Sequence, residues 1–196
     1  MTSIVDIMRA SPVMPVLVLE HVEDAVPLAE ALVSGGIRVL EVTLRTPAAL
    51  DSVRAIRSAL PDALVGVGTI TSVADLEAAR AAGAGFGVSP GTTPDLLAHA
   101  RGWSFPFLPG VMTPSDVMRA IESGYGAMKL FPARQAGGVE MLKALGGPFP
   151  QARFCPTGGI DAESAPGYLA LPNVVCVGGS WLAPPALLAG KDWAEI

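Results

Sequence analysis

The chain has 196 residues, of which 51% are hydrophobic and 16% charged, and its net charge is −5. This composition excludes a disordered chain, which needs low hydrophobicity and high net charge, and its glycines lack the regular repeat of collagen. The acidic balance gives no clustered positive charge for nucleic acid or for an acidic membrane surface. No apolar run approaches the roughly 18–20 residues of a membrane span. We therefore expect one domain over residues 1–196, with neither a nucleic-acid nor a membrane partner.

Residues 1–6 carry neither a basic region nor a continuous apolar region, so we expect no signal peptide and a cytoplasmic protein. Cys155 and Cys176 lie within apolar runs, which is typical of reduced cysteines. The two histidines, His21 and His99, are far apart in the sequence, so we expect surface positions for both and no metal site. The low charge of the chain also favours an oligomer that covers part of the surface.

Short apolar runs rich in β-branched residues alternate with alanine-rich helical patterns along the whole chain. A helix is expected first, over Ser3–Ala10. Eight strands follow, with starts 19 to 26 residues apart, over Val13–Leu19, Val39–Thr43, Leu64–Val67, Phe86–Ser89, Phe105–Leu108, Ala127–Phe131, Arg153–Pro156 and Val174–Val177. Helix starts are indicated by Thr46-Pro47, Ser72, Thr93-Pro94 and Thr113-Pro114, and helix ends by Gly35-Gly36, Gly83 and Gly124.

Strictly alternating β and α units predict a parallel sheet covered by helices. An open doubly wound sheet usually has five or six strands, whereas eight units favour a closed (β/α)8 TIM barrel. Such barrels typically have about 200 residues or more, so this chain should be a minimal barrel with short loops. We expect the last helix to begin after Asp192 and to be curtailed at Ile196.

Lys129 stands inside an apolar predicted strand, at the end of the barrel where the chemistry of this fold is carried. A lysine there is almost never fully buried unless it is paired or used. An apolar environment favours the free amine, which can attack a carbonyl and form a Schiff base. The alternative is a lysine at the strand edge whose ammonium group reaches solvent.

Glu41 is the second unusual residue, because it interrupts the apolar strand Val39–Thr43. The two-residue period of a strand puts Glu41 and Arg45 on the face that points into the barrel mouth, where Glu41 can meet Lys129. A carboxylate there can act as a general acid and base. The alternative is a structural ion pair of Glu41 with Lys129 or Arg45.

Glycine-rich turns follow the last two predicted strands, as Thr157-Gly158-Gly159 and Gly179-Ser180. In barrels these two turns recurrently bind phosphate through backbone N–H groups. A single Gly-Gly pair is usually only a tight turn, but two such turns at the expected strands favour a phosphate site.

Taken in order, these motifs resemble the 2-keto-3-deoxy-6-phosphogluconate aldolase family, which is also known for 4-hydroxy-2-oxoglutarate cleavage. The resemblance runs from about Pro12 to the end of the chain and is carried by Gly36–Thr46, Val65–Thr69, Val88–Gly91, Lys129–Ala133, Arg153–Ile160 and Val177–Trp181. It implies a trimeric class I aldolase that needs no metal or other cofactor. The implied substrate is a keto-deoxy sugar phosphate, cleaved to pyruvate and glyceraldehyde 3-phosphate.

The resemblance also implies roles for individual residues. Lys129 would form the Schiff base, and Glu41 would be the general acid and base, acting through a water. The implied substrate contacts are Arg45 and Thr69 for the carboxylate, Pro90 and Phe131 for the pyruvoyl pocket, and Thr157, Gly158, Gly159, Gly179 and Ser180 for the distal hydroxyl and phosphate. Two other hypotheses stay open: a phosphate-binding barrel epimerase or lyase without a Schiff base, and a non-catalytic assembly scaffold.

Overall fold

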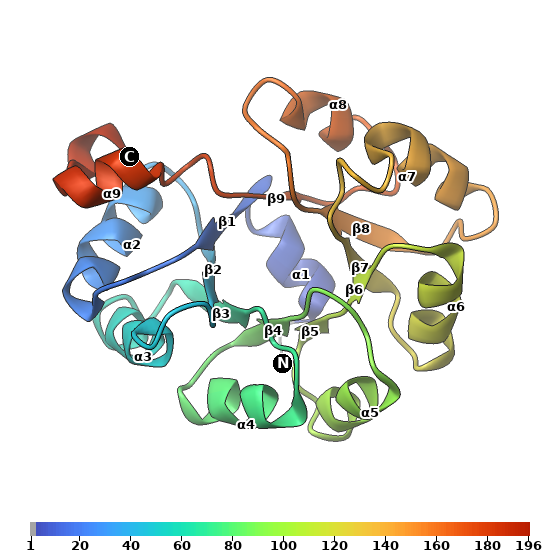
Figure 1. The fold of residues 1–196 in the computed structure, drawn as a ribbon, viewed down its shortest axis with the longest axis horizontal. Coiled ribbons are helices and arrows are strands. Elements are labelled where there is room, and N and C mark those ends of the chain that lie inside the picture. The colour runs from blue at the N-terminus through green and yellow to red at the C-terminus, as the bar shows by residue number, and fades with distance from the viewer. Residues whose placement is uncertain (1–2) are drawn as a thin grey trace.

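In the computed structural model, which describes residues 3–196, parallel strands lie at the centre and helices form a ring around them (Figure 1). The strands are β1 (Val13–Leu17), β2 (Val39–Thr43), β3 (Leu64–Gly68), β4 (Phe86–Val88), β5 (Phe107–Leu108), β6 (Gly110–Val111), β7 (Ala127–Leu130), β8 (Arg153–Pro156) and β9 (Val177–Gly179). The helices are α1 (Ile4–Arg9), α2 (Ala25–Ser34), α3 (Ala49–Ala59), α4 (Val73–Ala81), α5 (Pro94–Gly102), α6 (Pro114–Glu122), α7 (Gly138–Gly146), α8 (Ala165–Leu169) and α9 (Pro185–Gly190), with 3-10 turns η1 (Val22–Asp24) and η2 (Trp193–Glu195).

The strands form two parallel sheets that curl around one interior. The first has the order β5-β4-β3-β2-β1-β9 and the second the order β6-β7-β8. Isolated parallel bridges, Phe154 with Val174 and Thr157 with Gly178, link β8 to the segment around β9. The prediction of alternating strands and helices with parallel pairing is therefore confirmed.

Several predicted strands differ from the observed ones by one or two residues at one end, and the fifth and eighth differ most. The fifth does not begin at Phe105, whose N–H donates to the carbonyl of Ala100 at the end of α5, and it is split into β5 and β6 at Pro109. Proline has no N–H to give to a strand ladder. The eighth strand lies at Val177–Gly179, because these residues pair with Val13–Pro15 of β1.

The predicted helix starts are confirmed where a hydroxyl caps the helix. The side chains of Ser72, Thr93 and Thr113 each accept a backbone N–H in the first turn of α4, α5 and α6. The start at Thr46-Pro47 was wrong: α3 begins at Ala49, and the Thr46 hydroxyl donates to the carbonyl of Leu19 instead.

The last helix also differs from its prediction. We expected it to begin after Asp192, but α9 begins at Pro185, where proline suits the first helical position. The residues after Asp192 form the 3-10 turn η2.

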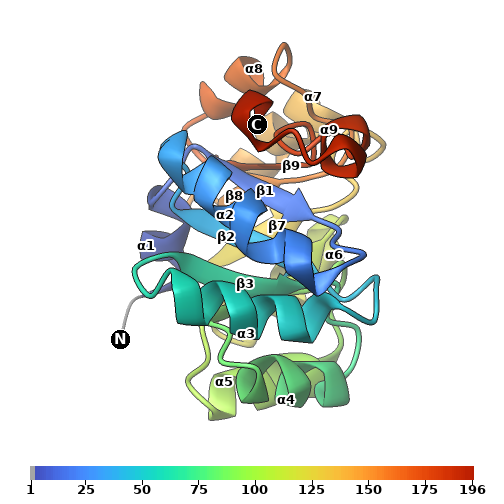
Figure 2. The same ribbon diagram turned by 90° about the vertical axis from the view of Figure 1, so that its left-hand side faces the viewer.

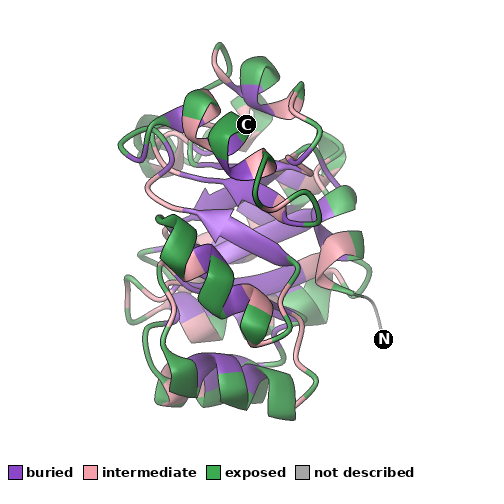
Figure 3. Cartoon of the chain, turned by 90° about the vertical axis from the view of Figure 1, so that its right-hand side faces the viewer, coloured by how far each residue is buried: buried purple, intermediate pink, exposed green. Residues whose placement is uncertain are grey.

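The core is divided between an outer layer and the interior of the curled sheets. Val65 and Val67 of β3 pack in one cluster with buried residues of the helices. In Figure 3 the strands are coloured mainly as buried, and the helices around them carry both buried and exposed residues. At the end where the strands begin, α1 covers the interior (Figure 2), and its Ile7 and Met8 pack in one cluster with Met14. No helix within residues 3–196 is both long and apolar enough to cross a membrane.

Candidate active site

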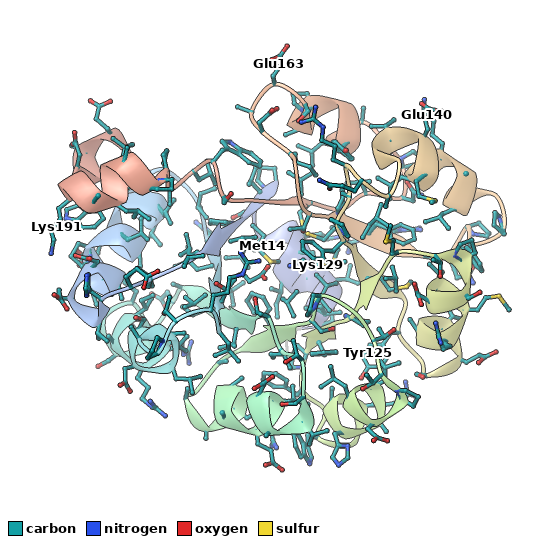
Figure 4. The ribbon with its side chains drawn as sticks, in the orientation of Figure 1. Met14, Tyr125, Lys129, Glu140, Glu163 and Lys191 are labelled. Carbon is teal, nitrogen blue, oxygen red and sulfur yellow. The ribbon has the colours of Figure 1, made fainter. Side chains whose placement is uncertain are left out.

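The centre of the candidate site is a buried ion pair between β2 and β7. The Nζ atom of Lys129 lies 3.0 Å from Oε1 and 3.5 Å from Oε2 of Glu41. The two residues are only 5% and 1% exposed, respectively, and Figure 4 shows Lys129 near the middle of the ring of helices. This contact confirms the prediction that the two side chains meet in the interior. They do so because the alternation of strand faces directs both inward.

The other lysines of the chain have ordinary surroundings. Lys143 pairs with Glu140 at 2.8 Å on α7, and both side chains are mostly exposed. Lys191 pairs with Asp24 at 2.8 Å, and the hydrogen bond and charge of Asp24 raise the pKa of Lys191. Lys191 and Glu140, the partner of Lys143, both lie at the outside of the molecule (Figure 4). Moving two charged groups out of water costs free energy, which offsets much of what their pairing gains. The buried pair at Lys129 is therefore weak support for stability, and a functional role is the better explanation for it.

Lys129 is also distinguished from the thiols near it. Cys155 stands opposite Lys129 in the β7–β8 ladder, and Cys176 is fully buried. A hydrogen bond with Cys155, burial, and the negative charge of Glu41 raise the pKa of Cys176 well above its ordinary value. The raised pKa keeps Cys176 as a neutral thiol. Since only the thiolate is a good nucleophile, Lys129 is a better candidate nucleophile than Cys176.

A cavity of about 860 Å³ brings together most of the other predicted site residues. Its lining includes Arg45, Phe131, Thr157, Gly158, Gly159, Gly179 and Ser180. The Phe131 ring connects this cavity to the ion pair, since its centroid lies 5.4 Å from Nζ of Lys129. Arg45 is exposed and lies two residues beyond the end of β2, at the border of the cavity.

Thr69 and Pro90 are at neighbouring strand ends but are not part of this lining. Thr69 directly follows β3 and has a φ of +62°, an unusual conformation for a β-branched residue. Backbone strain of this kind clusters at functional sites. Pro90 follows β4 and lies against Gly110 of β6, where a methyl group would clash with its backbone.

The glycine turn after β8 bends sharply at the edge of the cavity. Gly158 and Gly159 have φ values of +103° and +72°, which residues with a side chain rarely adopt. The turn is held by the N–H of Arg134, which donates to the carbonyl of Gly158 at 3.1 Å. Thr157 is buried beside it, over Gly178 of β9.

Sequence reasoning missed four polar residues that line the same cavity, namely Glu20, His21, Asp24 and Gln135. His21 is exposed, as predicted, but its position also borders the cavity. Glu20 and His21 lie just beyond β1, so their place at a strand end was the available signal. No cluster of three or more His, Cys, Asp or Glu side chains that could hold a metal ion occurs within residues 3–196.

Comparison with known proteins gives a consistent match over the whole chain. The family model of KDPG and KHG aldolases matches residues 4–196. The chain is 52% identical to 2-dehydro-3-deoxy-phosphogluconate aldolase of Pseudoalteromonas atlantica, over 97% of this chain and 89% of that protein. It is 48% identical to the KHG/KDPG aldolase of Escherichia coli, over 100% of this chain and 92% of that protein.

A solved structure of similar sequence is the KDPG aldolase from Legionella pneumophila, with pyruvate captured at low pH as a covalent carbinolamine intermediate. It superposes with a TM-score of 0.97 at 47% identity, covering 99% of this chain and 94% of that one. Together with the family model, these matches show that this chain belongs to the KDPG and KHG aldolase family.

Proposed function

We propose that this protein is a class I aldolase that cleaves 2-keto-3-deoxy-6-phosphogluconate to pyruvate and glyceraldehyde 3-phosphate. The observation that carries the proposal is the buried pair of Lys129 and Glu41, 3.0 Å apart beside a large cavity. A nucleophilic amine with a carboxylate within hydrogen-bond reach is the arrangement that covalent carbonyl chemistry needs. The names of the related proteins support the same reaction.

In this reaction the free amine of Lys129 attacks the C2 carbonyl carbon, and loss of water gives a protonated imine. The imine withdraws the electron pair of the C3–C4 bond as that bond breaks. Glu41, acting through a water, accepts the proton of the C4 hydroxyl, and glyceraldehyde 3-phosphate leaves as the aldehyde. The remaining enamine takes a proton at C3, and water hydrolyses the resulting imine to pyruvate and free Lys129. No separate cofactor is required, because the imine itself accepts the electrons.

The two ends of the substrate need different contacts. Arg45 and Thr69 hold the carboxylate next to the keto group, and Pro90 and Phe131 line that pocket. The distal hydroxyl and phosphate bind at Thr157, Gly158, Gly159, Gly179 and Ser180. This assignment is supported by the cavity, which is lined by Arg45 and by the glycine turns together.

Cleavage of 4-hydroxy-2-oxoglutarate is a second reaction that we propose for the same site. This substrate has the same keto, C4-hydroxyl and carboxylate groups at the reacting end and ends in a carboxylate instead of a phosphate. The KHG/KDPG name of the Escherichia coli relative supports it.

We further propose a closed (β/α)8 barrel as a single domain, assembled as a cytoplasmic homotrimer. The eight-strand count is supported by β5 and β6, which flank Pro109 and are two parts of one strand. Bridges from Phe154 and Thr157 support closure between β8 and β9. Met112 and Met118 are 41% and 52% exposed, and such large apolar side chains are suited to a subunit interface.

The test is pyruvate release from 2-keto-3-deoxy-6-phosphogluconate, followed by a coupled assay for the wild type and for Lys129→Ala. We expect release by the wild type and its loss in the variant. Borohydride with pyruvate should add a reduced adduct at Lys129, located by mass spectrometry. Cleavage without an adduct would indicate a lyase that uses no Schiff base, and a regular oligomer without cleavage would indicate a scaffold.

A further inference from the structure

The interior face of β3 carries no side chain at the level of the active site. Gly66 and Gly68 alternate along this strand with Val65 and Val67, which pack outward against the helices. A methyl group added at Gly68 would lie 2.7 Å from both Cγ and Cδ of Glu41 and closer still to its Oε1. The Glu41 side chain therefore occupies the volume that any larger residue at position 68 would fill.

Backbone conformation does not account for a glycine here. The glycines with positive φ lie at other positions, and the left-handed residue next to Gly68 is Thr69. Position 68 lies within the regular β2–β3 ladder, opposite Thr43, where residues with a side chain fit equally well. The feature specific to this position is the contact with Glu41.

Neither partner of this contact has room to withdraw. The N–H of Leu44 donates to the carbonyl of Gly68 at 3.0 Å, which holds the β3 backbone against β2. Glu41 is 1% exposed and is held by the Nζ atom of Lys129. Since Cγ and Cδ are both too close to an added methyl group, rotation of the carboxylate alone would not relieve the clash.

We propose that Gly68 is a positioning residue, whose missing Cβ provides the space that directs the Glu41 carboxylate at Lys129. A side chain at position 68 would move this carboxylate away from the amine without touching the substrate. The steric part of this inference depends on the structure alone. Its catalytic consequence rests on the proposed aldolase function.

The catalytic part is tested with Gly68→Ala, assayed for kcat and KM of pyruvate release. We expect kcat to fall by about 100-fold or more, the range typical of losing a general acid–base, with KM changed by less than about threefold. Adding Glu41→Asp, which shortens the side chain by one methylene group, should raise kcat at least about tenfold above Gly68→Ala alone. A kcat of Gly68→Ala near the wild-type value, or a double variant no more active than the single one, would overturn the proposal.

Gly66→Ala is the matched control on the same face of β3. Its added methyl group would lie 2.5 Å from Cε1 of Phe86, in the core below the ion pair. We expect Gly66→Ala to destabilise the fold. Adding Glu41→Asp to Gly66→Ala should not raise its kcat. Recovery in this background too would show that the shorter side chain acts generally and would count against the role of Gly68.

A stability cycle tests the contact without any activity measurement. Thermal unfolding is compared for the wild type, Gly68→Ala, Glu41→Ala and the double variant. Removing the Glu41 side chain should relieve most of the Tm loss caused by Gly68→Ala. If Gly68→Ala alone does not fold, the double variant with Glu41→Ala should fold. An equal loss in both backgrounds would refute the steric role, whereas a wild type that releases no pyruvate would refute only the proposed function.

Discussion

At the scale of single residues, the buried pair of Glu41 and Lys129 carries the proposed chemistry. Glu41→Gln keeps the shape of the side chain and a hydrogen-bonding oxygen but removes the carboxylate that accepts the proton. We expect kcat for pyruvate release to fall by about 100-fold or more. Glu140→Gln is the control, because Glu140 also pairs with a lysine but is exposed on α7, and it should leave kcat unchanged. Similar kcat values for the two variants would contradict the role of Glu41.

The same residues show why this part of the site could be predicted. A charged residue inside an apolar strand is conspicuous in a sequence, and the two-residue period of a strand gives its direction. Lys129 and Glu41 were found on that basis. Glu20, His21, Asp24 and Gln135 were missed, because lining a cavity is a property of segments that meet only in the folded chain.

At the scale of elements, the hydroxyl caps determine where helices begin. The Thr113 side chain accepts the N–H of Asp116, and the Asp116 carboxylate accepts the N–H of Thr113. Thr113→Ala should therefore lower the free energy of unfolding by about 1 kcal/mol in denaturant titrations. Ser58→Ala, an exposed position within α3, serves as the control and should leave stability nearly unchanged or slightly higher. Equal effects would contradict the capping role.

The cap of α6 also makes stability depend on pH. Partial burial acts to raise the pKa of Asp116, but hydrogen bonds from Thr113, Met112 and Arg119 outweigh it and hold this pKa below 3.8. The stabilisation is therefore present above pH 3.8 and is lost as the pH falls through the lowered value. Between pH 6 and about pH 3, Asp116→Asn should lose less stability than the wild type, as measured by thermal unfolding. Parallel curves for the two proteins would contradict this.

The elements that differ from prediction do so for long-range reasons. The apolar, β-branched run predicted the last strand at Val174–Val177, whereas pairing with β1 sets it at Val177–Gly179. The strand is split at Pro109 because β5 pairs with β4 and β6 pairs with β7, and Pro109 between them has no N–H to donate to either neighbour. By contrast, the starts of α4, α5 and α6 depend on residues three apart, and those were predicted correctly.

At the scale of the whole molecule, the two ends of the strands have separate tasks. The end covered by α1 is an apolar cluster, and the opposite end carries the candidate site. Met8→Ala removes a fully buried side chain from the α1 cluster, so we expect a loss of about 2–5 kcal/mol in the free energy of unfolding. Below the unfolding temperature, kcat and KM should stay at wild-type values. A large change in KM in a fully folded variant would show that the two ends are coupled.

The positions of Glu41 and Lys129 also have a mechanical consequence. Glu41 lies on β2 in the first sheet, and Lys129 lies on β7 in the second. The two sheets also meet around Pro109, where the N–H of Gly110 donates to the Ser89 hydroxyl at 3.2 Å, and at isolated bridges near β9. The ion pair at the proposed reaction centre thus also joins a residue of the first sheet to a residue of the second. Each covalent cycle would convert the Lys129 amine to an imine, so each turnover would break and then restore this contact between the two sheets.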